Sequence, residues 1–209
     1  PHLIRLNERF MINGVSIDDN DIETLIETFR VRAERSGISP TFFEVNTAVA
    51  FQYFANENVD IALIEVGLGG RFDSTNVIVP ELSVVTNIDL EHTEYLGDTH
   101  GAIAFEKAGI IKPGVPVVFG LLNDEAAGVL YEVAETRGSP VYALGDGFGI
   151  RESEGGNGLE YGGETWELAG LRLGLAGEHQ RANAALALAA AELLSERFPR
   201  ITSGSAAGA

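Results

Sequence analysis

The sequence predicts an α/β protein with a mostly parallel sheet flanked by helices and a small antiparallel β appendage. Short apolar runs at Ile61–Val66 and Leu82–Ile88 have the length and composition of buried strands. Stretches with helical spacing separate these runs from later ones, as in a doubly wound sheet. From residue 147 to about residue 176 the pattern changes to short alternating segments punctuated by glycine, which is typical of antiparallel hairpins.

The composition is that of an ordinary globular protein, and its charge argues against two kinds of partner. With 209 residues, 45% of them hydrophobic, the chain can bury one substantial core. The 14 basic and 31 acidic residues give a formal charge of −17, which repels phosphate backbones and anionic lipids. We therefore expect neither a nucleic-acid nor a membrane partner. Cysteine is absent, so we expect no disulfides and a cytoplasmic location.

The first third of the chain predicts a turn and two helices. We expect a turn at Asn13-Gly14 between two extended segments, because these residues accept positive φ angles. Asp18 and Asp19 can cap a helix that reaches about Arg35, and a second helix follows Pro40. The apolar side chains recur with helical spacing in both helices: Ile22, Leu25, Ile26 and Phe29 in the first, and Phe43, Thr47, Ala50, Phe51 and Phe54 in the second.

Strands and helices then alternate to the end of the chain. We expect strands at Val115–Phe119 and Pro140–Ala143 with a helix at Asp124–Arg137 between them. The last helix, Glu178–Arg197, is rich in alanine and leucine. Residues 199–209 are small and polar, so we expect a linker or tail after a domain that covers residues 1–198. The oligomeric state is left open.

Glu65 stands where a ligand could approach the backbone. It ends an apolar run and precedes Gly67, Gly69 and Gly70. Its carboxylate could bind a metal ion or accept hydrogen bonds from the amides of its own turn, and the sequence does not decide between these roles. The glycines lack the spacing of a dinucleotide-binding fingerprint. In addition, charged and polar residues follow them where a regular helix would be expected.

His92 and Lys107 are two further candidates. His92 follows a predicted strand, with Asp89 and Glu91 close in sequence; a lone histidine is more often structural than a ligand, but this position favours a ligand more than usual. Lys107 lies four residues after Ile103, on the apolar face of a predicted helix, where lysine is unusual. It could be a snorkelling side chain or a modified or catalytic amine.

Longer motifs carry a resemblance to a known family. The segments EVGLGGRFDSTN, NIDLEHTEYLG and EKAGIIKPG, with TFFE upstream and GEHQRAN downstream, occur in this order. Together with PHLIRLNERFMING they resemble the central ATPase domain of folylpolyglutamate synthase, often bifunctional with dihydrofolate synthase, in the Mur ligase superfamily. The resemblance covers essentially residues 1–198 and implies a fold like that of P-loop NTPases.

The resemblance implies an ATP-dependent amide ligase. In such enzymes ATP phosphorylates a carboxylate of folate or dihydropteroate, and the amino group of L-glutamate then attacks the acyl phosphate. By motif position, Glu65 and His92 resemble ligands of Mg²⁺, and His92 and Lys107 resemble catalytic residues. Lys107 matches a lysine that the family carries as a carbamate, a modification that requires a neutral amine.

The resemblance also implies substrate contacts. Thr41, Phe43 and Ser74 resemble positions that line a pterin site, where an aromatic ring and a hydroxyl suit a flat heterocycle. Asn183 resembles an asparagine that contacts adenine. Core packing is the alternative for Phe43, and capping of the last helix is the alternative for Asn183 and His179. Asp73 and Asn76 are expected to fix the glycine turn, with ligand contact as a further role.

The sequence also departs from the family pattern. No phosphate-binding loop with the spacing GxxxxGK(S/T) occurs in these 209 residues, and we expect the carboxyl-terminal domain of the family to lie outside them. The family usually has glycine and aspartate where Asp89 and Glu91 stand. We therefore expect an incomplete central domain with little or no ligase activity by itself. Two alternatives remain: another Mur-type amino-acid ligase, and a non-catalytic folate-binding module.

Overall fold

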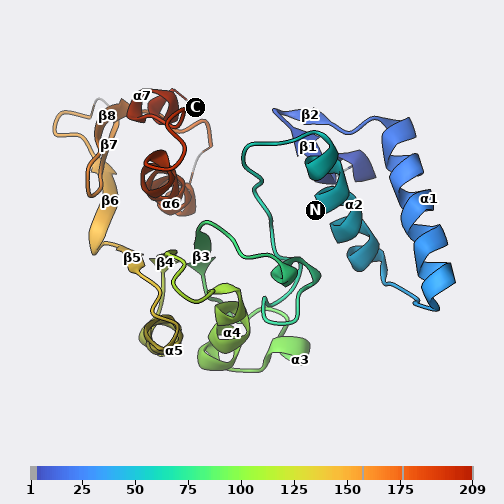
Figure 1. Ribbon diagram of the computed structural model, residues 1–209. Coiled ribbons are helices and arrows are strands. Elements are labelled where there is room, and N and C mark those ends of the chain that lie inside the picture. The colour runs from blue at the N-terminus through green and yellow to red at the C-terminus, as the bar shows by residue number, and fades with distance from the viewer. Residues whose placement is uncertain (1–3, 157, 176, 209) are drawn as a thin grey trace. The chain divides into compact units, whose positions relative to one another are not determined.

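The structure is a computed structural model that describes residues 4–156, 158–175 and 177–208. The chain forms two compact units (Figure 1). The first contains the residues up to Leu68 together with Asp73–Val77, and the second contains Gly69–Phe72 and the residues from Ile78 onward. Each unit is described by itself.

The first unit is built on two helices and a short hairpin. Strands β1 (Met11–Ile12) and β2 (Val15–Ser16) pair antiparallel, and the predicted turn between them has positive φ at Asn13 and Gly14. Helix α1 spans Asp19–Ser36, and helix α2 spans Phe42–Asn56. The 3-10 helices η1 (Leu6–Arg9) and η2 (Ser74–Val77) complete the unit. The core that these elements share is formed by Phe10, Ile17, Ile22, Leu25 and Val49.

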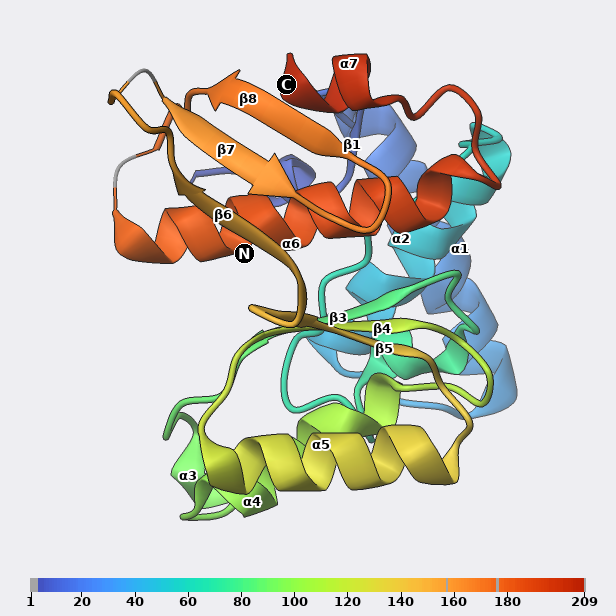
Figure 2. The same ribbon diagram turned by 90° about the vertical axis from the view of Figure 1, so that its left-hand side faces the viewer.

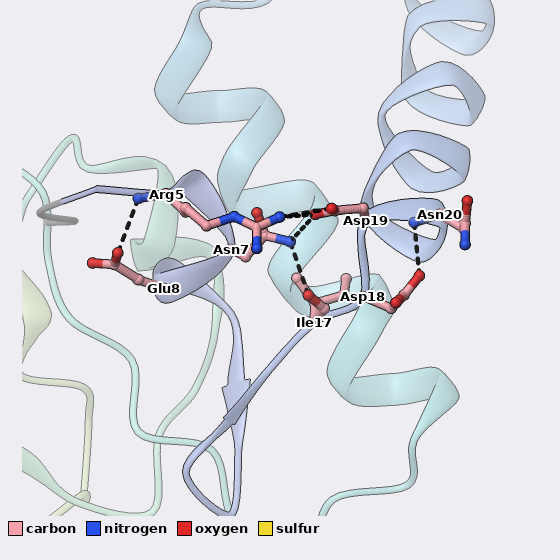
Figure 3. A network of polar contacts seen from close by, with 7 residues as sticks. All are labelled: Arg5, Asn7, Glu8, Ile17, Asp18, Asp19 and Asn20. Carbon is pink, nitrogen blue, oxygen red and sulfur yellow. Dashed lines mark hydrogen bonds and ion pairs between the residues drawn. The ribbon is translucent and has the colours of Figure 1, made fainter.

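Polar contacts tie the start of the chain to α1. The Asp18 carboxylate accepts a hydrogen bond from the Asn20 amide, as the predicted cap requires. The Arg5 guanidinium contacts both carboxylate oxygens of Asp19, at 2.5 and 2.6 Å (Figure 3). The Asn7 amide donates to the Ile17 carbonyl and to Asp19, each at 2.9 Å. These contacts fix the hairpin against the first turn of α1.

The second unit is a six-stranded sheet with the order β3-β4-β5-β6-β7-β8. Strands β3 to β6 pair parallel, and strands β6 to β8 pair antiparallel. The strands are β3 (Ser83–Asn87), β4 (Val117–Leu121), β5 (Val141–Leu144), β6 (Gly147–Glu152), β7 (Leu159–Gly162) and β8 (Glu167–Leu171). The predicted antiparallel appendage is therefore confirmed as a continuation of the parallel sheet.

Helices cover both faces of this sheet. Figure 2 shows α4 (His100–Lys107) and α5 (Asp124–Thr136) on one face of β3 to β5, and α6 (Glu178–Ser195) on the opposite face. The first layer buries Ile103, Phe119 and Leu130 completely. The second layer buries Val118 of β4 against Ala185 of α6. Helix α3 (Thr93–Leu96) precedes α4, and the 3-10 helix η3 (Ala108–Ile110) follows it.

One sequence prediction was wrong. Residues 61–66 form no strand, because no strand of the described chain runs beside them to complete a ladder, and Leu63 is 96% exposed. The predicted tail contains a short helix, α7 (Ser203–Ala207), which Thr202 caps and which contacts β8 and α6. Small polar residues can form such a turn once a cap and a packing surface are present.

A buried carboxylate joins the antiparallel strands to α6. Glu192 is 7% exposed and accepts hydrogen bonds from the Tyr161 hydroxyl at 2.7 Å and the Trp166 amide at 2.8 Å. The amide and hydroxyl of Thr165 donate to the same carboxylate. Burial alone would raise the pKa of Glu192, but these hydrogen bonds outweigh it and hold the pKa below its ordinary value.

We predict that Glu192→Gln destabilises the fold by about 3 kcal/mol at pH 7, because buried donors lose a charged acceptor. The folded-state pKa of Glu192 is lowered, so its contribution is present above the unfolded value of about 4.3 and is lost as the pH falls through the folded value. Urea denaturation from pH 7 to pH 3 measures this. The exposed control Glu135→Gln should retain the wild-type pH profile; an unchanged acid limb in Glu192→Gln would contradict the prediction.

Candidate functional site

Lys107 ends helix α4 and meets a carboxylate. Thr99 caps this helix through the Ala102 amide, and the buried Ile103 fixes the helix against the core. The Lys107 side chain is 23% exposed, and its ammonium donates a hydrogen bond to Glu91 at 2.8 Å. This hydrogen bond, aided by the charges of Lys107 and His92, holds the pKa of Glu91 below its ordinary value. The unusual lysine is thus held in an ion pair in this structure, and its modified or catalytic role remains a prediction.

His92 stands beside this pair in the sequence. It lies between β3 and α3 with a left-handed backbone, φ 50° and ψ 37°, which is uncommon for a residue other than glycine. Its side chain is exposed and makes no capping bond to α3, although its carbonyl accepts hydrogen bonds from Tyr95 and Leu96. At the end of β3, the Asn87 side chain donates to Asp89 in this loop. The loop after β3 thus presents an imidazole and carboxylates to solvent.

Glu65 belongs to the first unit, whereas His92 belongs to the second. Its side chain is exposed. The suggested alternative role, acceptance from the amides of its own turn, is taken by Asp73, which accepts from the amides of Gly67 and Leu68 at 3.0 Å. Among the described residues no three acidic, histidine or cysteine side chains are grouped as a metal site. The shared metal role of Glu65 and His92 remains a prediction.

Asp73 organises the turn, in agreement with the sequence prediction. Its second carboxylate oxygen accepts from the amide of Thr75 at 2.9 Å and from the hydroxyl of Thr75 at 2.5 Å. Its carbonyl accepts from the Asn76 amide at 2.9 Å. These bonds begin η2 at Ser74, a position that is partly buried. Ser74 is therefore held by its neighbours on both sides.

Thr41 and Phe43 have structural roles in the first unit. Thr41 caps α2: its hydroxyl accepts from the Glu44 amide, and its own amide donates to the Glu44 carboxylate. The ring of Phe43 lies against Gly67, where the methyl group of an alanine would come within 2.4 Å of the ring. Phe43 thus packs against the glycine-rich turn, as its structural alternative suggested. Its contact with a pterin remains a prediction.

Asn183 is exposed on α6. Its amide is 3.5 Å from the Gln180 side chain. The N-cap residue of α6 is Gly177, whereas Asn183 lies in the second turn of the helix. Asn183 therefore does not have the capping role that was its alternative. A contact with adenine remains a prediction.

The glycine-rich loop Gly69–Phe72 packs directly on the end of α4. The Arg71 amide donates to the Glu106 carbonyl at 2.8 Å. A side chain at Gly109 would come within 2.2 Å of the Arg71 backbone, and one at Gly70 within 3.0 Å of the Lys107 carbonyl. Only glycine permits this approach. This backbone contact could not be predicted from the sequence, because Arg71 and Gly109 are far apart in the chain.

Comparisons with known proteins identify the family of this chain. The sequence matches the Mur ligase middle domain over residues 23–191. The chain belongs to this family. This Mur ligase middle domain is 41% identical over 204 residues to the dihydrofolate synthase/folylpolyglutamate synthase of Bacillus subtilis, covering 94% of this chain and 47% of that protein. It is 38% identical to the mitochondrial folylpolyglutamate synthase of Homo sapiens, covering 98% of this chain and 33% of that protein.

Solved structures of folylpolyglutamate synthases have the same fold. A complex with AMPPCP and folate has a TM-score of 0.87 and 36% identity, covering 95% of this chain and 50% of that one. The enzyme of Thermotoga maritima has a TM-score of 0.83 and 38% identity, covering 92% of this chain and 46% of that one. The Mur ligase middle domain therefore spans about half the length of these relatives. No helix in its described part has the length and apolar character needed to cross a bilayer.

We predict that Gly109→Ala destabilises this Mur ligase middle domain by about 2 kcal/mol, because the added methyl group meets the Arg71 backbone. Gly128→Ala is the matched control: its methyl group would have open space on α5, so we expect a gain of roughly 0.5 to 1 kcal/mol. Urea denaturation compares the two variants. Equal changes in the free energy of unfolding of the two variants would show that the contact between residue 109 and the Arg71 backbone does not require glycine.

Proposed function

We propose that this Mur ligase middle domain is part of an ATP-dependent ligase that adds glutamate to folates, and that the same enzyme can join glutamate to dihydropteroate. The observation that carries this proposal is the match of 94% of the chain to a dihydrofolate synthase/folylpolyglutamate synthase at 41% identity. The substrates are ATP, L-glutamate and a folate or dihydropteroate. We also propose a cytoplasmic location and a domain boundary near residue 198.

The proposed reaction has two steps. The terminal phosphoryl group of ATP is transferred to a carboxylate oxygen of the folate, which gives an acyl phosphate and ADP. The nitrogen of glutamate then attacks the acyl carbon, phosphate leaves, and the nitrogen loses a proton as the amide forms. Positioning and neutralisation of charge supply most of the rate enhancement in such transfers.

The residues named from the sequence fit these steps in their chemistry. Mg²⁺ commonly takes only one or two protein carboxylates and completes its shell with water and phosphate oxygens, so the exposed Glu65 suits one such ligand. His92 is proposed as a second ligand from the resemblance of its motif alone. When bound, the ion would neutralise charge on the transferring phosphoryl group. Phe43, Thr41 and Ser74 would receive the pterin, and Asn183 the adenine.

Lys107 is proposed to act as a carbamate. Its amine nitrogen would add to carbon dioxide and release a proton, which places a negative charge where the ammonium stood. In the described structure that ammonium is paired with Glu91 at 2.8 Å. A carbamate would bring two like charges together, so Glu91 disfavours the modification and must turn away when it forms.

Incubation with ¹³C-bicarbonate tests the carbamate. The sequence contains two lysines, Lys107 and Lys112, so a ¹³C carbamate signal can be assigned by substitution. We expect the signal to disappear in Lys107→Arg, to persist in Lys112→Arg, and to increase in Glu91→Gln. Absence of the signal from the wild-type protein would contradict carbamylation, and an unchanged signal in Glu91→Gln would contradict competition by Glu91.

An activity assay tests the proposed function. The assay compares two proteins: the 209 residues by themselves, and the natural polypeptide, which is the product of the whole reading frame that encodes them. With ATP, Mg²⁺, L-glutamate and tetrahydrofolate, we expect the natural polypeptide to release ADP and phosphate and to lengthen the folate by glutamate. The 209 residues by themselves should show little turnover.

Substitution of the two lysines makes this assay specific. Lys107→Met should lower kcat by about 100-fold or more, whereas Lys112→Met should retain activity. Turnover only with a peptidoglycan precursor would instead indicate another Mur-type ligase. Folate binding without turnover in the natural polypeptide would indicate a non-catalytic module.

A further inference from the structure

The glycine-rich loop presents an arginine flanked by two phenyl rings. The central carbon of the Arg71 guanidinium lies 4.7 Å from the ring centroid of Phe72 and 5.1 Å from that of Phe105. Both rings face solvent, Phe72 being 82% exposed and Phe105 48% exposed. The Arg71 side chain is 47% exposed. A cation and two aromatic rings therefore form one surface of the second unit.

This surface stands on a fixed backbone. The Arg71 amide is bonded to the Glu106 carbonyl, and the Arg71 backbone fills the space that Gly109 leaves open. Phe105 belongs to α4, which is packed in the core through Ile103. The loop and the helix thus hold the guanidinium near both rings before any ligand arrives, which lowers the entropy cost of binding.

The chemistry of the guanidinium and of the rings suits one kind of ligand. The Arg71 guanidinium lies 3.7 Å from the Glu106 carboxylate, so a ligand carboxylate would compete with Glu106 for this partly exposed cation. A planar guanidinium binds carboxylates through paired hydrogen bonds, and an adjacent phenyl ring favours an aromatic group on the same ligand. The complementary ligand is an aromatic ring linked to a carboxylate.

We propose that Arg71, Phe72 and Phe105 form a subsite for the p-aminobenzoyl-glutamate part of a folate. This inference rests on the proposed function, which supplies folate as the acceptor. The two rings pack against the benzoyl ring, and Arg71 binds the carboxylate of the terminal glutamate that does not react. Arg71 contacts substrate but takes no part in bond formation.

The subsite would distinguish the two acceptors, folates and dihydropteroate, by the number of their carboxylates. A folate with a glutamate tail has a second carboxylate, whereas dihydropteroate has a single carboxylate, which is the one that reacts. Arg71 should therefore contribute to the binding of folates and not to that of dihydropteroate. A merely structural arginine would affect both acceptors alike.

Calorimetric titration of the natural polypeptide with p-aminobenzoyl-glutamate tests binding directly. We expect Arg71→Gln to raise Kd at least tenfold and Arg71→Lys to give a smaller rise, because lysine keeps the charge without the paired geometry. Arg32→Gln is the matched control, since Arg32 lies 5.6 Å from the Phe29 ring on α1. An unchanged Kd in Arg71→Gln, or an equal rise in Arg32→Gln, would overturn the subsite.

Kinetics with the two acceptors provide the second readout. Arg71→Gln should raise KM for tetrahydrofolate at least tenfold with kcat largely retained, and should leave KM for dihydropteroate unchanged. Equal losses with both acceptors would overturn the assignment. If the wild-type polypeptide turns over neither acceptor, the proposed function fails, and the titration still decides whether the subsite exists.

Discussion

The close approach of the glycine-rich loop to the end of α4 governs the candidate site of the second unit. Backbone meets backbone there, since the Arg71 amide is bonded to the Glu106 carbonyl and Gly109 has no side chain to separate the two segments. The same contact fixes the backbone of Arg71, and Gly70 in the same loop approaches the carbonyl of Lys107. The catalytic role proposed for Lys107 would need a support of this kind, because errors of about one ångström in the position of a catalytic group reduce rates severely.

Helix α4 can serve as that support because it belongs to the core. Ile103 and Ala104 are fully buried against α5 and the parallel strands, while the opposite side of the sheet is covered by α6. Loops that follow parallel strands meet at one edge of a sheet. The loop after β3 carries His92 and Glu91 and reaches the end of α4 through the ion pair with Lys107. Rigid layers thus hold polar groups that are themselves exposed.

The sequence predicted features whose causes are local. The ends of α1 follow from Asp18 and from Gly37, which takes the left-handed conformation expected of a helix end. The Asn13-Gly14 turn was predictable for the same reason. The run at 61–66 was not, because a strand depends on a neighbouring strand and not only on its own composition.

Features that join distant segments escaped sequence analysis. Lys107 was recognised as unusual, but its pairing with Glu91 depends on how the loop after β3 folds back on α4. Arg71 was one polar residue among several after the glycines, and nothing in the sequence distinguished Glu192 within an alanine-rich helix. Only the tertiary structure reveals that each is fixed by a partner from another element.

The carboxylate of Glu192 also bears on the order in which the protein can be completed. Synthesis proceeds from the amino terminus, so Tyr161, Thr165 and Trp166 leave the ribosome before the residue that accepts their hydrogen bonds. Until α6 follows, these donors must remain hydrated and the apolar face beneath that helix stays open. The antiparallel end of the sheet therefore matures late, during an interval in which a nascent chain is most exposed to aggregation and to chaperones.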